Sequence, residues 1–166
     1  MPSNHHKVEQ LIAKFHHAFQ HLDVPADGMI CSSSRERIAA EPGLQRLISH
    51  LSAQYWMKVD AMLMREHAQD LPLLTPEAFR YFVPAFATYA LRCFPEEDDV
   101  LSFLLMSLDP TDRHGIKLAI LAERFRLFDA DQRAAVKRFL IFFRSESRDA
   151  TTRKASTDAL ESYWQG

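Results

Sequence analysis

The chain has 166 residues, of which 47% are hydrophobic and 25% charged, and its formal net charge is −2 at pH 7. This length and composition are typical of one folded domain with a sizeable core, whereas the near-neutral charge excludes a general attraction to nucleic acid or anionic membranes. With only four glycines, the sequence also argues against folds built on phosphate-cradling loops or tight hairpins.

The N-terminal part of the chain contains two apolar patterns at helical spacing. A helix is predicted over residues 7–22 by the first pattern, which consists of Val8, Leu11, Ile12, Phe15, Phe19 and Leu22. Pro25 and Gly28 mark a loop over residues 23–34, and a short helical turn follows before Pro42 and Gly43. The second pattern predicts a helix that continues, with a bend, toward His67; it begins with Leu44, Leu47, Ile48 and Leu51.

A clear helix start occurs at Thr75. Thr75 suits the N-cap, Pro76 suits the first helical position, and Glu77 favours the positive end of the helix dipole. Pro84 lies inside the apolar pattern that follows and cannot donate a backbone hydrogen bond, so this helix is predicted to kink or break there.

The remaining sequence predicts three more helices. One follows the acidic residues Glu96, Glu97, Asp98 and Asp99, one covers residues 118–128, and one begins after an N-cap at Asp129. Residues 145–157 are polar and are predicted to be a flexible linker, and residues 1–6 are also predicted to be flexible. A short helix is predicted over residues 158–164. The expectation is a single all-α domain over residues 1–166, a bundle of about six to eight helices.

Neither a signal peptide nor an apolar run of membrane-spanning length is present, which predicts a cytoplasmic protein that is not inserted in a membrane. The two cysteines, Cys31 and Cys93, are far apart in sequence. The sequence does not decide whether they form a disulfide, but two reduced thiols are the better expectation for a cytoplasmic protein.

Five histidines fall near the N-terminus, and His17 and His21 have the i, i+4 spacing with which two imidazoles can share a metal ion. These two residues project away from Phe15 and Phe19, however, so a solvated polar face is the preferred interpretation.

Glu66, His67 and Asp70 are close in sequence, but nothing in their spacing demands that they converge in a pocket. No catalytic, cofactor or metal site is therefore predicted, and an enzyme or metalloprotein using the N-terminal histidines or Cys31 is the third alternative.

Two charged segments offer binding surfaces. Glu96, Glu97, Asp98 and Asp99 cap a helix in the simplest interpretation, but they also suit docking of a basic protein partner, with Tyr55 and Tyr81 as aromatic anchors. The alternative is nucleic-acid binding through a basic stripe that projects to one side of a helix: Arg133, Lys137, Arg144 and Arg148. We expect the protein partner rather than the nucleic acid.

The segment LTPEAFRYFVPAF, residues 74–86, resembles a recurring string in a bacterial family of small uncharacterised proteins, which reads close to LTPEAFRYYLPAF. The resemblance extends over residues 44–144, including the later Asp131-Gln132-Arg133-Ala134-Ala135-Val136 pattern. It implies a shared helical shape and assigns no chemistry. Small bacterial proteins of this kind often accompany secreted toxins, so the resemblance leads us to expect an immunity-type inhibitor that neutralises a bacterial toxin by direct binding.

Overall fold

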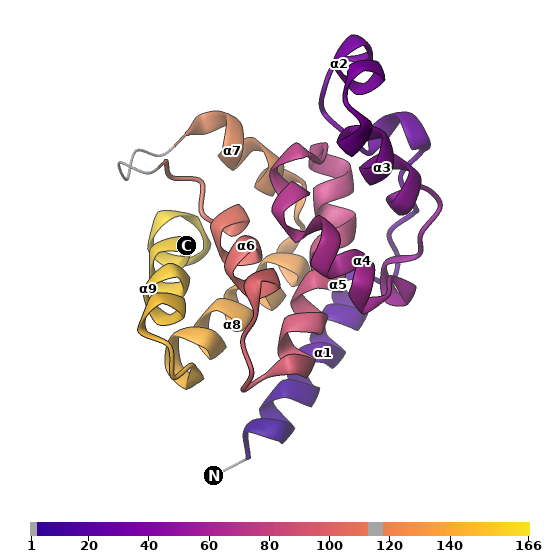
Figure 1. Ribbon diagram of the computed structural model, residues 1–166. Coiled ribbons are helices and arrows are strands. Elements are labelled where there is room, and N and C mark those ends of the chain that lie inside the picture. Colours follow the sequence, from indigo (N-terminus) through magenta and orange to yellow (C-terminus); the bar gives the residue numbers. More distant parts are fainter. Residues whose placement is uncertain (1–2, 113–117) are drawn as a thin grey trace.

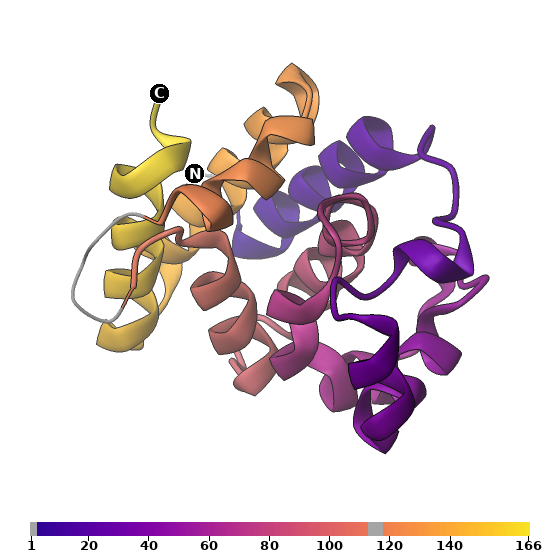
Figure 2. The same ribbon diagram turned by 90° about the horizontal axis from the view of Figure 1, so that it is seen from above.

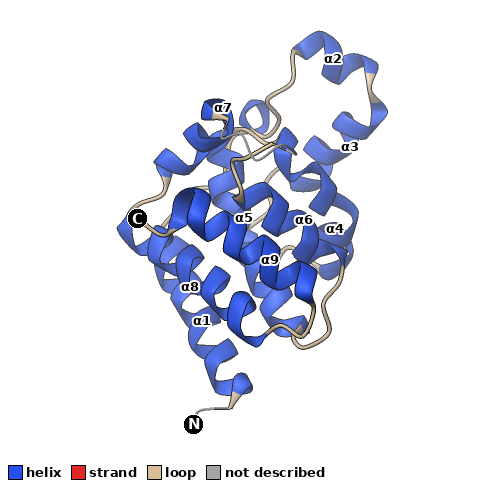
Figure 3. Ribbon diagram, turned by 90° about the vertical axis from the view of Figure 1, so that its left-hand side faces the viewer, coloured by secondary structure: helices blue, strands red, loops and turns tan. Residues whose placement is uncertain are grey.

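The computed structural model describes residues 3–112 and 118–166, and within these residues the chain folds into α-helices joined by loops and short helical turns (Figures 1 and 3). The predicted all-α class is confirmed. Nine α-helices occur in the described residues: α1 (Asn4–Phe19), α2 (Arg35–Ala40), α3 (Pro42–Leu51), α4 (Ala61–His67), α5 (Pro76–Cys93), α6 (Asp99–Leu108), α7 (Ala119–Glu123), α8 (Ala130–Glu146) and α9 (Ala150–Ala159).

The helix expected from Leu44 toward His67 is divided in two, which partly explains why the structure has more helices than the sequence predicts. Ala53 has a positive φ of 56° just after α3, a conformation that a right-handed helix cannot continue through. The chain then buries Trp56, whose indole N–H donates to the carbonyl of Phe19 at 3.3 Å. α4 begins only after Asp60, whose side chain accepts from the Leu63 N–H.

Helix α5 is the central helix, with 13 of its 18 residues buried. The predicted start is confirmed, because Pro76 opens the helix and the Thr75 hydroxyl accepts from the Ala78 N–H at 3.1 Å. The helix is not broken at Pro84, which lies buried inside it. One turn later, the Thr88 hydroxyl donates to the Pro84 carbonyl at 2.8 Å.

The core lies where α1, α5 and α8 meet, and its largest side chains are aromatic. Phe15 stacks on Phe19 along α1 and meets the edge of Phe139 from α8, while Phe79 of α5 packs against Phe125. Such pairs bury large apolar areas in defined geometries. The many phenylalanines of the sequence thus serve mainly to join these helices.

Residues 145–157, predicted as a linker, are largely helical in the structure. α8 continues to Glu146, and α9 follows at once behind the N-cap Asp149, packing beside α8 (Figures 1 and 3). The buried side chains of α9 are small, namely Thr152, Ser156 and Ala159, so the segment packs closely without the bulky residues that mark a core helix in sequence.

Both chain ends are helical, the N-terminal end contrary to expectation and the C-terminal end in agreement with it. Residues 4–6 belong to α1, which begins behind the N-cap Ser3, whereas residues 1–2 lie outside the described residues. After α9, one π-helical turn (Leu160–Trp164) buries Trp164, whose indole N–H donates to the Leu108 carbonyl at 2.8 Å. Among the described residues, no helix combines the length and the apolar composition needed to cross a bilayer.

Candidate functional site

The acidic segment before α6 has a clear structural role. The Asp98 carboxylate accepts from the Val100 N–H at 3.0 Å and from the Tyr89 hydroxyl at 2.7 Å, so it caps α6 and ties it to α5. Glu97 is half-buried, which leaves Glu96 and Asp99 as the exposed carboxylates of the predicted contact patch.

Of the two tyrosines predicted as partner anchors, Tyr81 belongs to the core and Tyr55 is half-buried. Tyr81 is 1% exposed, and its hydroxyl accepts from the Trp56 N–H at 3.2 Å. The prediction that Tyr81 is a surface anchor is therefore wrong: it falls on the inner side of α5, where its ring packs edge-on against Phe82.

The predicted basic stripe is divided by contacts with the C-terminal turn. Arg133 donates to the Phe125 carbonyl and to the Tyr163 hydroxyl, and its guanidinium lies over the Tyr163 ring at 4.9 Å. Lys137 donates to the Gln165 carbonyl at 3.0 Å. Arg144 and Arg148 are exposed. The half of the stripe at the start of α8 therefore holds the C-terminus in place.

A surface hollow of about 420 Å³ lies between the loop over residues 21–29, the start of α5 and Leu127, and we call it the α5 hollow. Three of its walls are large apolar side chains that remain exposed: Val24 at 39%, Met29 at 44% and Leu127 at 37%. Single exposed apolar residues are ordinary on protein surfaces, but several around one concavity are typical of a binding site.

The α5 side of the hollow is a single helical face. Glu77 and Arg80 line it from one face of the first turns of the helix, where their i, i+3 spacing places them together, and the buried Tyr81 also borders it. Arg80 is held in position because its Nε donates to Gln132 Oε1 at 2.8 Å. The hollow therefore combines an apolar wall with charged groups at its rim.

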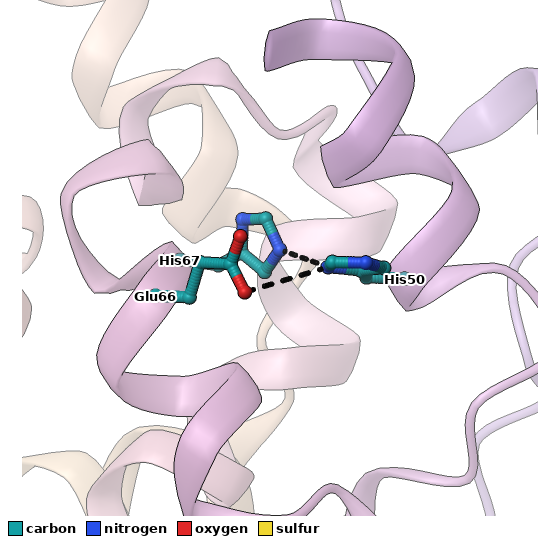
Figure 4. Close-up of side chains that lie close together, drawn as sticks. All are labelled: His50, Glu66 and His67. Carbon is teal, nitrogen blue, oxygen red and sulfur yellow. Dashed lines mark hydrogen bonds and ion pairs between the residues drawn. The ribbon is translucent and has the colours of Figure 1, made fainter.

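A second cluster joins α3 to α4. His50 Nδ1 lies 2.8 Å from His67 Nε2 and 3.8 Å from Glu66 Oε2 (Figure 4). Three potential metal-ligand atoms, one from each of these residues, lie within 4.8 Å of one another. Figure 4 shows the His50 ring directed from α3 toward Glu66 and His67, which sit on α4.

The hydrogen bonds define the proton positions in this cluster. His67 Nδ1 lies 2.9 Å from an oxygen of Asp70. A carboxylate can only accept, so His67 carries its proton on Nδ1 and its Nε2 is an acceptor when the ring is neutral. His50 Nδ1 must then donate to His67 Nε2, and a chain of hydrogen bonds runs from His50 through His67 to Asp70.

Glu66, His67 and Asp70 are recognisable as neighbours in the sequence, whereas His50 is not. His50 stands three residues after Leu47, on the flank of the buried face of α3, which gives it no distinguishing signal. Its position against α4 depends on the turn over residues 52–60. Because this turn includes the left-handed Ala53, the meeting of the two histidines is a tertiary feature that sequence spacing does not encode.

The N-terminal histidines form no comparable cluster within the described residues, where the group on α3 and α4 alone meets the distance condition for three ligands. His16 packs against the Trp56 ring, and burial lowers its pKa, as does the neighbouring Arg92. His17 and His21 are exposed, and His21 Nε2 lies 3.8 Å from Asp129.

Comparison with known proteins identifies a family. The model of a family of unknown function, DUF6714, matches residues 33–166. No curated protein and no solved structure matches the chain. Since the family model covers most of the sequence, including α2 to α9, the chain belongs to the family of unknown function DUF6714.

Proposed function

We propose that this chain is a protein-binding module whose α5 hollow receives an apolar side chain of a partner protein. The observation that carries the proposal is the gathering of Val24, Met29 and Leu127 around one concavity while each keeps more than a third of its surface exposed. Apolar anchors that fill such hollows contribute much of the binding energy at protein interfaces.

The shape of the hollow favours a protein over a small molecule. A small ligand is held by burying about 70–90% of its surface in an enclosed pocket. Here the apolar walls themselves face solvent, so the hollow suits one projecting side chain of a larger surface. Glu77 and Arg80 at the rim supply opposite charges that select the partner and its orientation.

In its narrower form, the proposal is that the partner is a bacterial toxin, neutralised by direct binding in the cytoplasm. Cys31 and Cys93 are both free cysteines, as the proposed reducing compartment requires. The exposed carboxylates Glu96 and Asp99 remain proposed as additional contacts for a basic partner surface. Nucleic-acid binding is not proposed as a second function, because Arg133 and Lys137 are engaged within the chain.

The decisive experiment compares partner capture by matched aspartate variants. Leu127→Asp and Met29→Asp each place a carboxylate in the hollow, and Met106→Asp places one on α6 at a side chain that is 68% exposed. Capture from nuclease-treated lysate of the native cells identifies the candidate partner, and titration of the purified pair then gives the affinity.

We expect the two variants in the hollow to weaken partner binding about 30-fold or more, since a lost hot-spot contact costs about 2 kcal/mol. Met106→Asp should bind like the wild type. Circular dichroism melting verifies that all three variants are folded. If both variants in the hollow bind with wild-type affinity, the hollow is not the contact. A captured partner whose toxicity is unaffected by the protein would refute the narrower, inhibitor form.

A further inference from the structure

We propose that His50, Glu66 and His67 form a binding site for a divalent transition-metal ion, with Zn²⁺ as the expected occupant. The site lies between α3 and α4 (Figure 4) and shares no residue with the α5 hollow. The inference therefore goes beyond protein binding and stands or fails independently of it.

The distances between the ligand atoms are close to those that zinc requires. With zinc–ligand bonds of about 2.0–2.1 Å in a tetrahedron, neighbouring ligand atoms lie about 3.3–3.4 Å apart. The two histidine nitrogens are 2.8 Å apart, and His50 Nδ1 is 3.8 Å from Glu66 Oε2. Opening the first distance and closing the second, each by about half an ångström, brings both to this spacing. The third distance, between His67 and Glu66, is within 4.8 Å.

His50 and Glu66, the two side chains that must rotate to bind the ion, are partly exposed to solvent. His50 and Glu66 keep about a third of their side-chain surface exposed, whereas the side chain of His67 is 3% exposed. His67 is therefore the fixed ligand. A small rotation of the other two side chains admits the ion without rearranging α3 or α4.

Asp70 supports His67 in the way typical of metal centres. A ligating histidine generally donates its second ring N–H to a carboxylate, which fixes the ring and leaves the other nitrogen free for the ion. Asp70 accepts from His67 Nδ1 at 2.9 Å and so leaves Nε2 facing His50. Arg46 lies 3.2 Å from Glu66 Oε1, which leaves Oε2 on the side of the histidines.

The ligand chemistry selects the class of ion. Two imidazoles and one carboxylate suit zinc and its neighbours in the first transition row, whereas Mg²⁺ and Ca²⁺ prefer oxygen ligands and Cu(I) prefers sulfur. The carboxylates of Glu66 and Asp70 place negative charge beside the ion, although Arg46 already pairs with Glu66. With three ligands from the protein, the fourth position is left for water, as in zinc sites that exchange ligands.

The alternative is that no ion binds and that the His50–His67–Asp70 chain of hydrogen bonds only stabilises the contact between α3 and α4. In that chain Glu66 takes no direct part: Arg46 holds its Oε1 at 3.2 Å, and its Oε2 lies 3.8 Å from His50 Nδ1, too far for a hydrogen bond. A shared ion accounts for all three residues.

The experiment is a metal titration of the full chain after dialysis against a chelator. Calorimetry with Zn²⁺ should show one ion per chain, and Co²⁺ should give the strong visible absorption of a tetrahedral complex. At a free Zn²⁺ concentration about 100 times the dissociation constant, the melting temperature should rise by about 5–10 °C. A lack of stoichiometric binding would overturn the proposal.

Matched variants locate the ion. His50→Ala and Glu66→Gln should each weaken Zn²⁺ binding about 100-fold, because each removes one ligand, whereas His17→Ala removes an exposed histidine of α1 and should change nothing. Glu66→Gln keeps the size of the side chain, which maintains the test if His50→Ala affects folding. Binding that survives both changes on α3 and α4 but is lost in His17→Ala would place the ion at the N-terminus and refute the site.

Discussion

At the scale of single residues, Tyr89 shows how one buried hydroxyl joins three helices. Its hydroxyl donates to Asp98 Oδ2 at 2.7 Å and accepts from Arg65 Nε at 2.9 Å. Burial raises the pKa of Tyr89 to about 12, with a further upward contribution from the hydrogen bond to Asp98 and a downward one from that of Arg65. The phenol therefore stays neutral and fully hydrogen-bonded well above pH 10.

This pKa predicts how stability changes in alkali. An unfolded tyrosine ionises near pH 10, so the folded state holds the Tyr89 proton more tightly than the unfolded state does. The stability that this difference contributes is complete below about pH 10 and is lost as the pH rises to about 12. Urea unfolding across this range should show the free-energy advantage of the wild type over Tyr89→Phe shrinking with pH. An advantage that stays constant would contradict the raised pKa.

At the scale of elements, Gln132 connects α1, α5 and α8 from a fully buried position. Its Oε1 accepts from Arg80 Nε on α5 and from the Asp129 N–H, and its Nε2 donates to the Ala18 carbonyl on α1 at 3.1 Å. The Asp129 carboxylate in turn accepts from the Gln132 N–H, which completes a capping box at the start of α8. The helix start and the helix packing thus depend on the same side chain.

Replacing Gln132 should therefore cost far more than losing an ordinary surface glutamine. Gln132→Ala leaves the buried Ala18 carbonyl and the part-buried Arg80 side chain and Asp129 N–H without this partner, and we expect a loss of about 2–4 kcal/mol in the free energy of unfolding. Gln20→Ala, at an exposed glutamine beyond α1, is the matched control and should cost less than about 0.5 kcal/mol. The measurement is the urea midpoint at unchanged slope. Equal midpoints for the two variants would refute this role.

Local signals account for the elements that were predicted correctly. Thr75 with Pro76, and Asp129 at the start of α8, stabilise helix starts through contacts within one turn, so short sequence windows reveal them. α9 was missed because Thr152, Ser156 and Ala159 have the right helical spacing but too little apolar bulk. A hydrophobic pattern is detected from large apolar side chains, whereas two helices can also pack closely through small ones.

The candidate sites could be predicted only in part, because both depend on contacts between distant segments. Glu77 and Arg80 share a helical face, but the loop over residues 21–29 completes the α5 hollow from far away in sequence. Likewise, Glu66 and His67 are adjacent, but His50 reaches them only through the turn after α3. The position of Tyr81 is hard to predict for the same reason: α1, α6 and the turn that carries Trp56 together decide which side of α5 faces the core.

At the scale of the whole molecule, burial is distributed unevenly along the chain. α5 lies at the centre with most of its residues buried, whereas α2 has no buried residue and projects at the edge beside α3 (Figures 1 and 2). Local opening requires little energy where few apolar contacts are broken. The structure therefore predicts a gradient of local stability from the edge of the molecule to its centre.

Hydrogen–deuterium exchange followed by mass spectrometry measures this gradient directly. Peptides from Arg35–Ala40 should exchange first, by local opening, while those from Pro76–Cys93 should exchange only as fast as the whole protein unfolds. The opening free energy of the α5 amides should then equal the unfolding free energy from urea, and both should fall together in Gln132→Ala, while exchange in α2 stays the same. If α5 exchanges as early as α2, the central helix is not the core on which the other helices depend.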